Sequence, residues 1–336
     1  MRQSIIALLA SGLLCMCFSD SLSIVAVGDV MFANNGTPFL DRFGLLYPFD
    51  SVKTELMDGD IRICNLEVAL ADSGTPFEKT YTYCMPTRHA GAVAAGCFDV
   101  VHLANNHILD FGVSALSSTL RLLDSMGIGH TGAGTTIAHA REPALVRKGS
   151  VITGFLSYSC TFPEEFWATS TRPGTAFCDS SYLARDIPAL REKVDYLVVS
   201  FHWGAERMTV PKDYQRALGR YCIDLGADAV LGHHPHVLQG IEVYKGRPIA
   251  YSLGNFTFST WTNAVWDSGI LRLFFADRMF VKAEFVPVLI NNFKVELQPR
   301  ILKGEEAQRT LKNFSALCDS VGTTLVIDGD RGYIKP

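Results

Sequence analysis

Short apolar runs alternate with amphipathic segments along the first two thirds of the chain. The runs are rich in Val and Ile and mostly lack polar alternation, which is typical of strands covered on both faces. Between them, apolar residues recur at helical spacing over 113–126 and 213–225, and a glycine stands at the end of each segment, where a C-cap is expected. The strands predicted in this way are 23–27, 60–64, 99–103, 151–156, 196–201 and 229–231.

The pattern changes after residue 240, where strands follow one another in hairpin order. These predicted strands are 241–244, 248–253, 269–275 and 279–288. A closing helix is predicted over 305–321. Strand–helix–strand order in the first part indicates an α/β layered fold. Because no linker or repeat interrupts the chain, we expect one domain with two sheets over 21–336.

Residues 1–20 predict an export signal. Arg2 supplies the positive start, and the apolar stretch from 5 to 14 has the length of a signal core. The stretch is too short to span a bilayer, which takes roughly 20 residues. We therefore expect an exported protein in a periplasmic or other extracytoplasmic location. Two cysteines, Cys15 and Cys17, leave a lipid anchor open as the alternative.

Composition narrows the possible partners. The 336 residues are 48% hydrophobic and 19% charged, enough to bury one large core or two modest ones. The formal net charge is −4, so the chain lacks the basic surface that nucleic acid requires and we expect no nucleic-acid partner. Seven cysteines would remain after signal cleavage, without a Cys-x-x-Cys motif. Most of them are expected to be small buried apolar residues, although Cys160 and Cys178 could form a disulfide.

Two stretches, 72–92 and 160–182, are rich in Pro, Thr, Ser and aromatic residues and show no periodicity. Long irregular segments in a compact domain often form binding loops. Their basic residues Lys79, Arg88 and Arg172 could contact an anionic substrate, or they could simply be solvated.

Polar residues cluster directly after five of the predicted strands. Open α/β sheets place their sites at the carboxyl ends of strands, so these clusters are expected to converge on one crevice. Their nitrogen and oxygen ligands without thiolate suit Mn, Fe or Zn. In chain order the clusters contain Asp29; Asn65 and Glu67; Asn106, His107 and Asp110; His202 and Glu206; and His233, His234 and His236.

Each residue taken alone has a simpler interpretation. Asp29 could cap a helix, Asn65 could be a turn residue, and His107 or His202 could be core histidines. Asn255 is interpreted as a structural turn residue. His89, His130 and His139 are assigned to surface or structural roles. Recurrence at five strand ends in order is improbable by chance, and it favours one shared metal site.

The motifs together resemble the CapA family of poly-γ-glutamate capsule synthesis proteins, also called PgsA, within the calcineurin-like metallophosphoesterase superfamily. The resemblance covers about residues 22–290. It implies a four-layer αββα sandwich, two mixed β-sheets flanked by helices, around a centre of divalent transition metal. The motifs that carry it are Gly28–Met31, Asn65–Glu67, Ala104–Gly112, His130–Gly134, His202–Glu206, Gly232–Gln239 and Tyr251–Phe256.

By position, the resemblance implies a role for each site residue. His107 would be the catalytic acid, oriented by Asp110. The implied metal ligands are Asp29, Asn65, Glu67, Asn106, His202, His234 and His236. The candidate substrate-binding residues are Glu206, Arg88 and His233, although His233 could exchange roles with His234.

The chain departs from the superfamily pattern in two places. Met31 stands where the superfamily has a histidine ligand, and Asn65 or Glu67 replaces the bridging aspartate. The implied centre therefore holds one or two ions of Mn, Fe or Zn.

Two functions from different classes remain. The first is an exported metal-dependent hydrolase or transferase of cell-envelope or capsule polymer biosynthesis, acting on a phosphoester or related anionic small molecule or polymer. The second is a non-catalytic accessory subunit of a membrane-bound capsule polymer synthesis or export complex, which the ligand lost at Met31 supports. The chain has no Gly-x-Ser-x-Gly and no P-loop Gly-Lys-Ser/Thr, which disfavours a serine hydrolase or P-loop nucleotidase.

Overall fold

The first strand, β1 (Leu22–Met31), lies inside a ten-stranded mixed sheet, here called sheet one. The computed structural model that shows this describes residues 21–264 and 267–336. Two short strands, β15 (Asn255–Phe258) and β18 (Arg300–Ile301), pair with β1 and β17 respectively. The main path of sheet one is β19 (Val326–Asp328), β20 (Arg331–Ile334), β17 (Met279–Leu289), β16 (Asp267–Ala276), β1, β2 (Ile61–Leu66), β5 (Val100–His102) and β6 (Gly129–Thr131).

A six-stranded sheet, here called sheet two, forms the second layer of strands. Its central strands run parallel, and a hairpin and an antiparallel strand close its two edges. In order, the strands are β13 (Leu238–Tyr244), β14 (Arg247–Leu253), β12 (Ala229–His233), β11 (Tyr196–His202), β9 (Val151–Ser159) and β8 (Ala144–Lys148). Two small pairs complete the strands, β3 (Ala69–Leu70) with β4 (Cys84–Met85) and β7 (Ala133–Gly134) with β10 (Gly174–Thr175).

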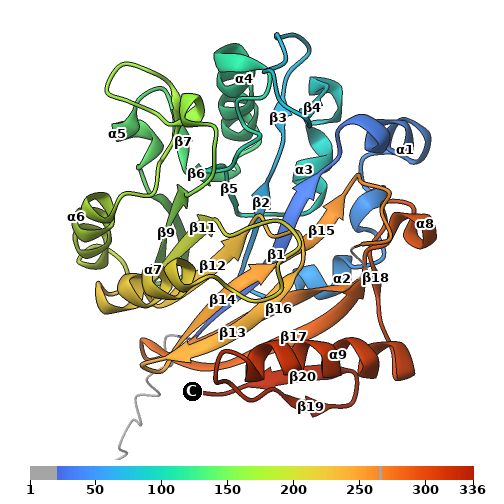
Figure 1. Ribbon diagram of the computed structural model, residues 1–336, viewed down its shortest axis with the longest axis vertical. Helices are drawn as coiled ribbons and strands as arrows, with labels where there is room; N and C mark the ends of the chain where they lie inside the picture. The colour runs from blue at the N-terminus through green and yellow to red at the C-terminus, as the bar shows by residue number, and fades with distance from the viewer. Residues whose placement is uncertain (1–20, 265–266) are drawn as a thin grey trace, which may run out of the picture.

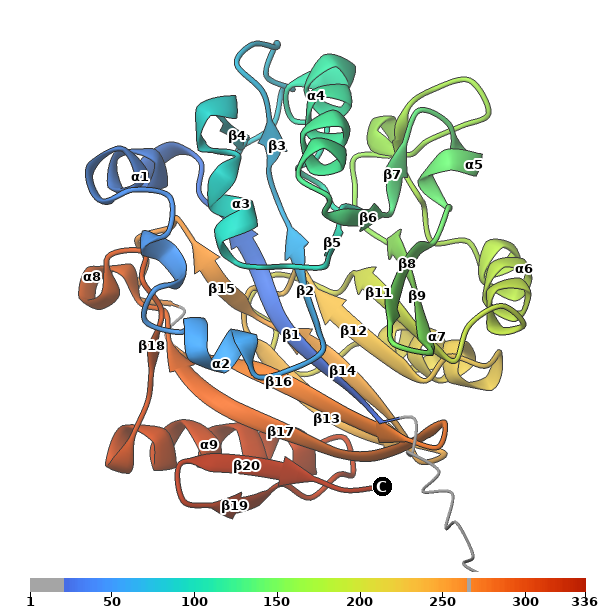
Figure 2. The ribbon, with the colours of Figure 1, turned by 180° about the vertical axis from the view of Figure 1, so that it is seen from behind.

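Helices cover the outer faces of both sheets (Figures 1 and 2). The helices are α1 (Thr37–Phe43), α2 (Lys53–Met57), α3 (Gly91–Ala95), α4 (Gly112–Ser125), α5 (Ile137–Ala140), α6 (Ser180–Arg191), α7 (Asp213–Asp224), α8 (Asn292–Val295) and α9 (Gly304–Asp319). Four 3-10 turns lie at Asn34–Gly36, Tyr47–Phe49, Thr87–His89 and Glu164–Phe166. In both views α9 runs along the end of the molecule beside β17 and β20.

Three large apolar cores account for the layers. Successive residues of β1 point to opposite faces, so that Ile24 packs between the two sheets while Val25 packs against α2, α3 and α4. On the far side of sheet two, Val199 packs with Leu183 of α6 and Cys222 of α7. The result is helix, sheet, sheet, helix. The predicted αββα sandwich is confirmed.

All six strands predicted from apolar runs are present, as are the helices α4, α7 and α9. The later strands do form hairpins, but β13–β14 belongs to sheet two and β16–β17 to sheet one. One prediction was wrong. Asn255 begins the strand β15, which pairs in parallel with β1, and is not a turn residue. The short β19–β20 hairpin near the C-terminus was not predicted.

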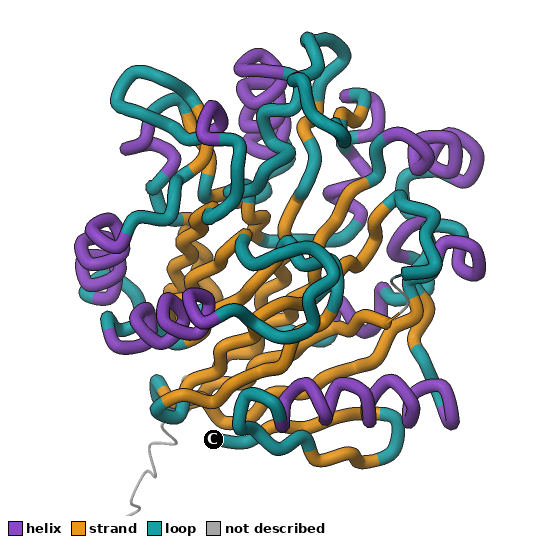
Figure 3. Tube along the Cα trace, in the orientation of Figure 1, coloured by secondary structure: helices purple, strands orange, loops and turns teal. Residues whose placement is uncertain are grey.

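The two irregular segments are mostly loops, drawn in teal in Figure 3. Short strands and single turns interrupt them, and the second passes into α6 at Ser180. Within residues 21–264 and 267–336, no helix has the length and apolar character of a membrane span. The predicted export signal, residues 1–20, lies outside the described residues, so both it and the single-domain boundary stay predictions.

Candidate metal centre

The candidate site lies where the carboxyl ends of strands from both sheets meet. β1 approaches β14 so closely there that a Cβ atom on Gly28 would stand 1.8 Å from the carbonyl oxygen of Gly254. Only glycine fits such an approach. The amide of Asp29 donates to the same oxygen at 2.9 Å. This contact joins the two sheets and places the Asp29 side chain between them.

Two buried carboxylates form the acidic part of the centre. Asp29 ends the regular part of β1, and Glu67 follows β2; both are fully buried. The side-chain amide of Asn65 donates to Asp29 Oδ1 at 2.8 Å and to Glu67 Oε2 at 3.2 Å. Asn65 therefore holds the two carboxylates in place through its nitrogen, and its carbonyl oxygen is directed elsewhere.

Three histidines face these carboxylates from sheet two. His202 lies at the end of β11, and His234 and His236 follow β12. Glu67, His202 and His234 form one group whose ligand atoms lie within 4.8 Å of one another. Asp29, Glu67 and His236 form a second group within the same limit. Glu67 belongs to both groups, so one carboxylate is shared by the two candidate ligand sets.

The turn after β12 is strained where it presents its histidines. His234 has φ of 93° and His236 has φ of 58°, both in the left-handed region. Such conformations cost about 1–3 kcal/mol each for a non-glycine residue and cluster at functional sites. Asn255 of β15 accepts a hydrogen bond from His236 Nδ1 at 2.8 Å. That bond directs Nε2 toward Glu67 Oε1, 3.9 Å away.

Asn105, which the sequence analysis did not select, connects the loop after β5 to the centre. Its side chain donates to Asn65 Oδ1 at 3.1 Å and to the Leu66 carbonyl at 2.9 Å, and it accepts from the His107 amide at 3.0 Å. Asn105 thus positions the neighbouring residues. Asn106, the predicted ligand, accepts from His202 Nε2 at 2.8 Å through its side-chain oxygen.

His107 lies in a separate hydrogen-bonded cluster beside Glu67. Its Nδ1 donates to Asp110 Oδ2 at 2.6 Å, and its Nε2 lies 3.8 Å from Glu67 Oε1. Lys79 reaches the same cluster from the first irregular segment, with its ammonium 2.5 Å from Asp110 Oδ1 and 3.2 Å from His107 Nδ1. The ring of Tyr83 packs on the imidazole at 4.2 Å between centroids.

The electrostatics of the centre follow from burial and close charges. Burial alone would raise the pKa of Asp29, but hydrogen bonds and charges from His233 and His236 outweigh it and hold this pKa well below its usual range. Burial and the nearby charge of Asp29 raise the pKa of Glu67 well above its usual range. Burial lowers the pKa of His234 to about 3.

The pKa values of the other three imidazoles shift in different directions, depending on whether burial or nearby negative charge dominates. Burial opposes protonation of His236, yet the charges of Glu67 and Asp29 raise its pKa to about 9. Burial lowers the pKa of His202 and, despite Asp110, that of His107.

The donor set fits a divalent cation. Glu67 Oε1 is buried and accepts no hydrogen bond from any described residue, and His234 Nδ1 has no partner within the same residues. Buried polar atoms are normally paired, so these two atoms are available to bind a cation. Imidazole nitrogens with carboxylate oxygens suit Mn, Fe or Zn.

The Met31 side chain contacts residues that belong to neither candidate ligand group. Its sulfur accepts from the Ala33 amide at 3.2 Å and from the Ser259 hydroxyl at 3.1 Å. Both candidate ligand groups therefore form without any contribution from position 31.

The predicted substrate-binding residues lie in different places. His233 is 1% exposed, and its Nδ1 lies 3.2 Å from Asp29 Oδ1, so its observed contact is with that carboxylate. Arg88 pairs with Asp41 at 3.2 Å on the surface. Glu206 is exposed on the segment after β11, near enough for its charge to raise the pKa of Glu67.

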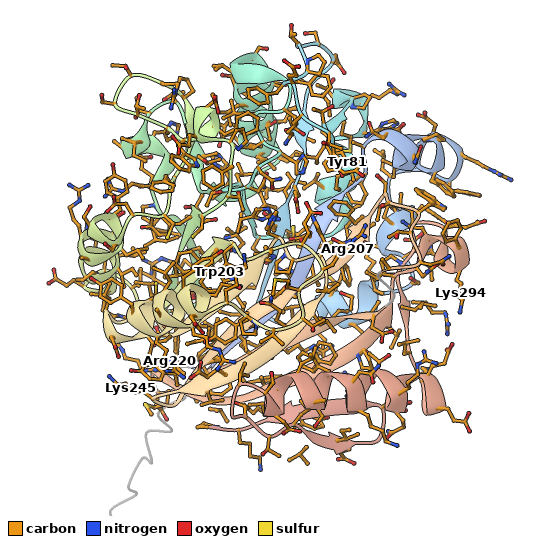
Figure 4. The ribbon with its side chains drawn as sticks, in the orientation of Figure 1. Tyr81, Trp203, Arg207, Arg220, Lys245 and Lys294 are labelled. Atoms are coloured by element: carbon orange, nitrogen blue, oxygen red, sulfur yellow. The ribbon has the colours of Figure 1, made fainter. Side chains whose placement is uncertain are left out.

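That segment crosses in front of the strand ends, where Figure 4 labels Trp203 and Arg207. The amide of Arg207 donates to the Pro235 carbonyl at 2.8 Å, which fixes the segment to the histidine turn. Arg172, the third basic residue considered, donates to the carbonyls of its own loop at Trp167 and Glu164.

The remaining histidines and cysteines have other roles. His89 contacts Asp41 at 2.7 Å and His130 contacts Asp124 at 3.0 Å. His102, also missed from the sequence, is buried under the centre with its ring 5.9 Å from that of His233. It is the last residue of β5 and lies one residue before the end of the predicted strand 99–103, where a polar residue could have signalled the site. Cys160 and Cys178 are free thiols in mutual contact.

Comparison with known proteins agrees with this geometry. The family model of the bacterial capsule synthesis protein PGA_cap matches residues 23–260. The chain belongs to this family. It is 29% identical over 280 residues to the capsule biosynthesis protein CapA of Bacillus anthracis, a match that covers 81% of this chain and 68% of that protein.

Two further likenesses differ in kind. A protein of Mycobacterium tuberculosis described as a probable polyglutamine synthesis accessory protein is 36% identical over 217 residues, which are 58% of this chain and 55% of that protein. The calcineurin-like phosphoesterase YfkN of Bacillus subtilis aligns with 88% of this chain and 98% of its own structure, at 15% identity and a TM-score of 0.45. A TM-score this low adds nothing to what the sheets of this chain already show.

Proposed function

We propose that this protein is a metal-dependent hydrolase or transferase of capsule polymer biosynthesis, acting on a phosphoester or a related anionic bond. The observation that carries the proposal is the position of Glu67, whose unpaired buried Oε1 belongs to two ligand groups at once. Two-metal sites of hydrolytic enzymes hold their ions about 3.5–4 Å apart, which a shared carboxylate achieves.

One or two divalent ions of Mn, Fe or Zn would be held by Asp29, Glu67, His202, His234 and His236. Bound there, the metal would supply Lewis-acid polarisation and positive charge for an anionic substrate. Asn65 holds the carboxylates through hydrogen bonds, so we assign it to orientation of the ligands. The Asn106 side-chain oxygen lies 2.8 Å from His202 Nε2, the nitrogen that also faces Glu67 Oε1 at 3.5 Å, so Asn106 is kept as a further ligand.

His107 is placed to act on a proton. Asp110 accepts from its Nδ1, which leaves Nε2 directed toward the centre. When protonated, Nε2 donates to the leaving oxygen of the substrate, the role of a general acid. Burial lowers the pKa of His107, and the negative charge of a bound substrate opposes that shift.

Lys79 completes this cluster. Its ammonium lies against both Asp110 and His107, and its side chain is only 18% exposed. The positive charge of Lys79 lies opposite the Asp110 carboxylate, whose other oxygen is hydrogen-bonded to the imidazole. Of the three basic residues in the irregular segments, Lys79 is the one whose contacts connect it to the site.

Elemental analysis combined with phosphoesterase assays tests the proposal. Protein purified without chelator is assayed for Mn, Fe and Zn and for hydrolysis of aryl phosphate monoesters and diesters, beside His236→Ala. We expect bound metal and metal-dependent hydrolysis in the parent, and the loss of both in His236→Ala. Fully metallated parent protein that cleaves no phosphoester, amide or related bond would refute the enzymatic role.

A second candidate is a non-catalytic accessory subunit of a capsule polymer synthesis or export complex. The withdrawal of Met31 from the centre favours it, as does the description of the mycobacterial relative as an accessory protein. This role predicts metal binding without turnover, together with copurification of membrane-bound partners. The export signal over 1–20 and an extracytoplasmic location belong to both candidates, and N-terminal sequencing of native protein tests them.

A further inference from the structure

A cavity of about 450 Å³ opens beside the candidate metal centre. His234, a member of one ligand group, forms part of its wall. Two further parts of the chain line the cavity. They are the second irregular segment, with Thr161 and Phe162, and the segment from β11 into α7, with Gly204, Lys212 and Tyr214. Cavities of about 300–1,000 Å³ are the usual size for small-molecule sites. Whatever occupies this one lies against the imidazole of His234.

We propose that the cavity binds an anionic end group of the substrate, a carboxylate or phosphate on a short apolar stem, next to the group held at the centre. This inference rests on the proposed function only in assuming that the reacting group lies at the centre. Binding in the cavity itself depends on its own residues.

The charge of the cavity supports an anionic ligand. Lys212 contributes an ammonium, and no carboxylate is among the described residues that line the cavity. The ammonium makes no ion pair within residues 21–264 and 267–336, whereas Lys79, the basic residue beside His107, pairs with Asp110. Its charge is close enough to act on His234.

A hydroxyl donor lines the same cavity. The Tyr214 oxygen accepts from the Gly204 amide at 2.6 Å, so its own hydrogen is left to point away from the backbone. Burial raises the pKa of Tyr214, which keeps that hydrogen in place at neutral pH. An ammonium and a hydroxyl donor together are a minimal carboxylate or phosphate site.

An exposed aromatic ring supplies the apolar part. Phe162 is 69% exposed, although it lies on the cavity wall. Its ring is 5.6 Å from that of Trp167, which stacks on Phe177 at 3.8 Å. A ring held in this way can cover the methylene groups of a ligand stem and recover the free energy of hiding apolar surface from water.

The test is calorimetric binding to the full chain as purified, with triglutamate as the carboxylate probe, O-phosphoserine as the phosphate probe and triglutamine as the uncharged probe. We expect Lys212→Gln to weaken binding of at least one anionic probe about tenfold, and Lys212→Arg to retain most of it. Lys312→Gln, on the exposed face of α9, is the matched control and should change nothing. Phe162→Ala should weaken the same probe several-fold.

The outcomes separate this inference from the proposed function. Lys212-dependent binding in a protein that cleaves nothing supports the cavity and removes the enzymatic role. Cleavage of a phosphoester by a protein whose Lys212→Gln variant binds both anionic probes as tightly as the parent overturns the cavity alone. Equal affinity for triglutamine and triglutamate, with no binding of O-phosphoserine, also overturns it. The probe whose affinity depends on Lys212 shows whether the end group is a carboxylate or a phosphate.

Discussion

Replacement of Glu67 by Gln changes the centre at the one residue that both ligand groups share. The amide keeps the shape of the side chain and removes its charge. Loss of even a supporting residue typically lowers metal affinity ~10–100-fold, so the loss of a shared ligand is expected to cost ~100-fold or more for each ion. His236→Ala, in contrast, removes a residue from one group only.

The same substitution should have little effect on the metal-free protein. Glu67 is fully buried beside Asp29, and burial with that neighbouring charge raises its pKa, so an ionised Glu67 is unfavourable there without a cation. The neutral amide avoids this cost. We expect the unfolding free energy of metal-free Glu67→Gln to lie within about 1 kcal/mol of the parent, or above it.

Metal should therefore stabilise the two proteins differently. A ligand at 100 times its Kd stabilises the folded state by about 2.7 kcal/mol, whereas at its Kd the gain is only about 0.4 kcal/mol. Thermal unfolding with and without Mn²⁺ measures this difference, and equilibrium dialysis counts the ions. Glu305→Gln is the matched control, because Glu305 is an exposed carboxylate on α9, outside both groups. If Glu67→Gln binds as many ions as tightly as the parent, the shared-ligand assignment is wrong.

Three further outcomes are expected. His107→Asn should leave metal content unchanged and lower kcat roughly 10²–10⁴-fold, less for substrates with good leaving groups; loss of metal in this variant would make His107 a ligand. Lys79→Met should lower kcat and shift its pH profile with little change in metal content, whereas an unchanged profile would give Lys79 a purely structural role. Arg331 and Arg272 hold the pKa of Glu55 below its usual value, although burial opposes them, so the stability that Glu55 contributes is present above the unfolded pKa of about 4.3 and lost as pH falls through the lower folded pKa. Urea unfolding should then show Glu55→Gln less stable than the parent at pH 7, by a margin that narrows as the pH falls below about 4. A margin that stays constant would contradict the assignment.

The apolar runs predicted the layers because each strand is buried on both faces. A strand buried in this way has apolar residues at consecutive positions, which the sequence shows directly. The strand β15 was not predicted, because its identity as a strand depends on a distant partner. Its four residues follow Gly254, where a turn is the usual local interpretation, and only long-range pairing of Asn255 with Asp29 makes them a strand. The residues next to Asn255 in the sequence do not indicate that it pairs with Asp29.

The same limit applies to side-chain direction within the site. Lys79, Arg88 and Arg172 all lie in the irregular segments, yet the first contacts Asp110 beside His107, the second pairs with Asp41 and the third donates to carbonyls of its own loop. Asn105 and Asn106 are adjacent asparagines, and the structure gives the first the greater number of site contacts. Spacing along the chain locates such residues within a loop, but the conformation of the loop decides which of them turns inward.

The position of Met31 bears on which of the two functions is favoured. A lost ligand would suggest a centre that can no longer hold metal, if the remaining residues were too few or too far apart. Here each group still brings three residues together, and Glu67 connects the groups. Three protein ligands with an open position are the usual arrangement of a catalytic zinc ion, whereas structural sites are closed. The Met31 sulfur accepts hydrogen bonds from the Ser259 hydroxyl and the Ala33 amide, so the Met31 side chain is directed toward these residues and not toward the ligand groups. The substitution at position 31 is therefore compatible with an open, reactive centre, and the intact pairing of His107 with Asp110 beside it favours the enzymatic role over a purely structural one.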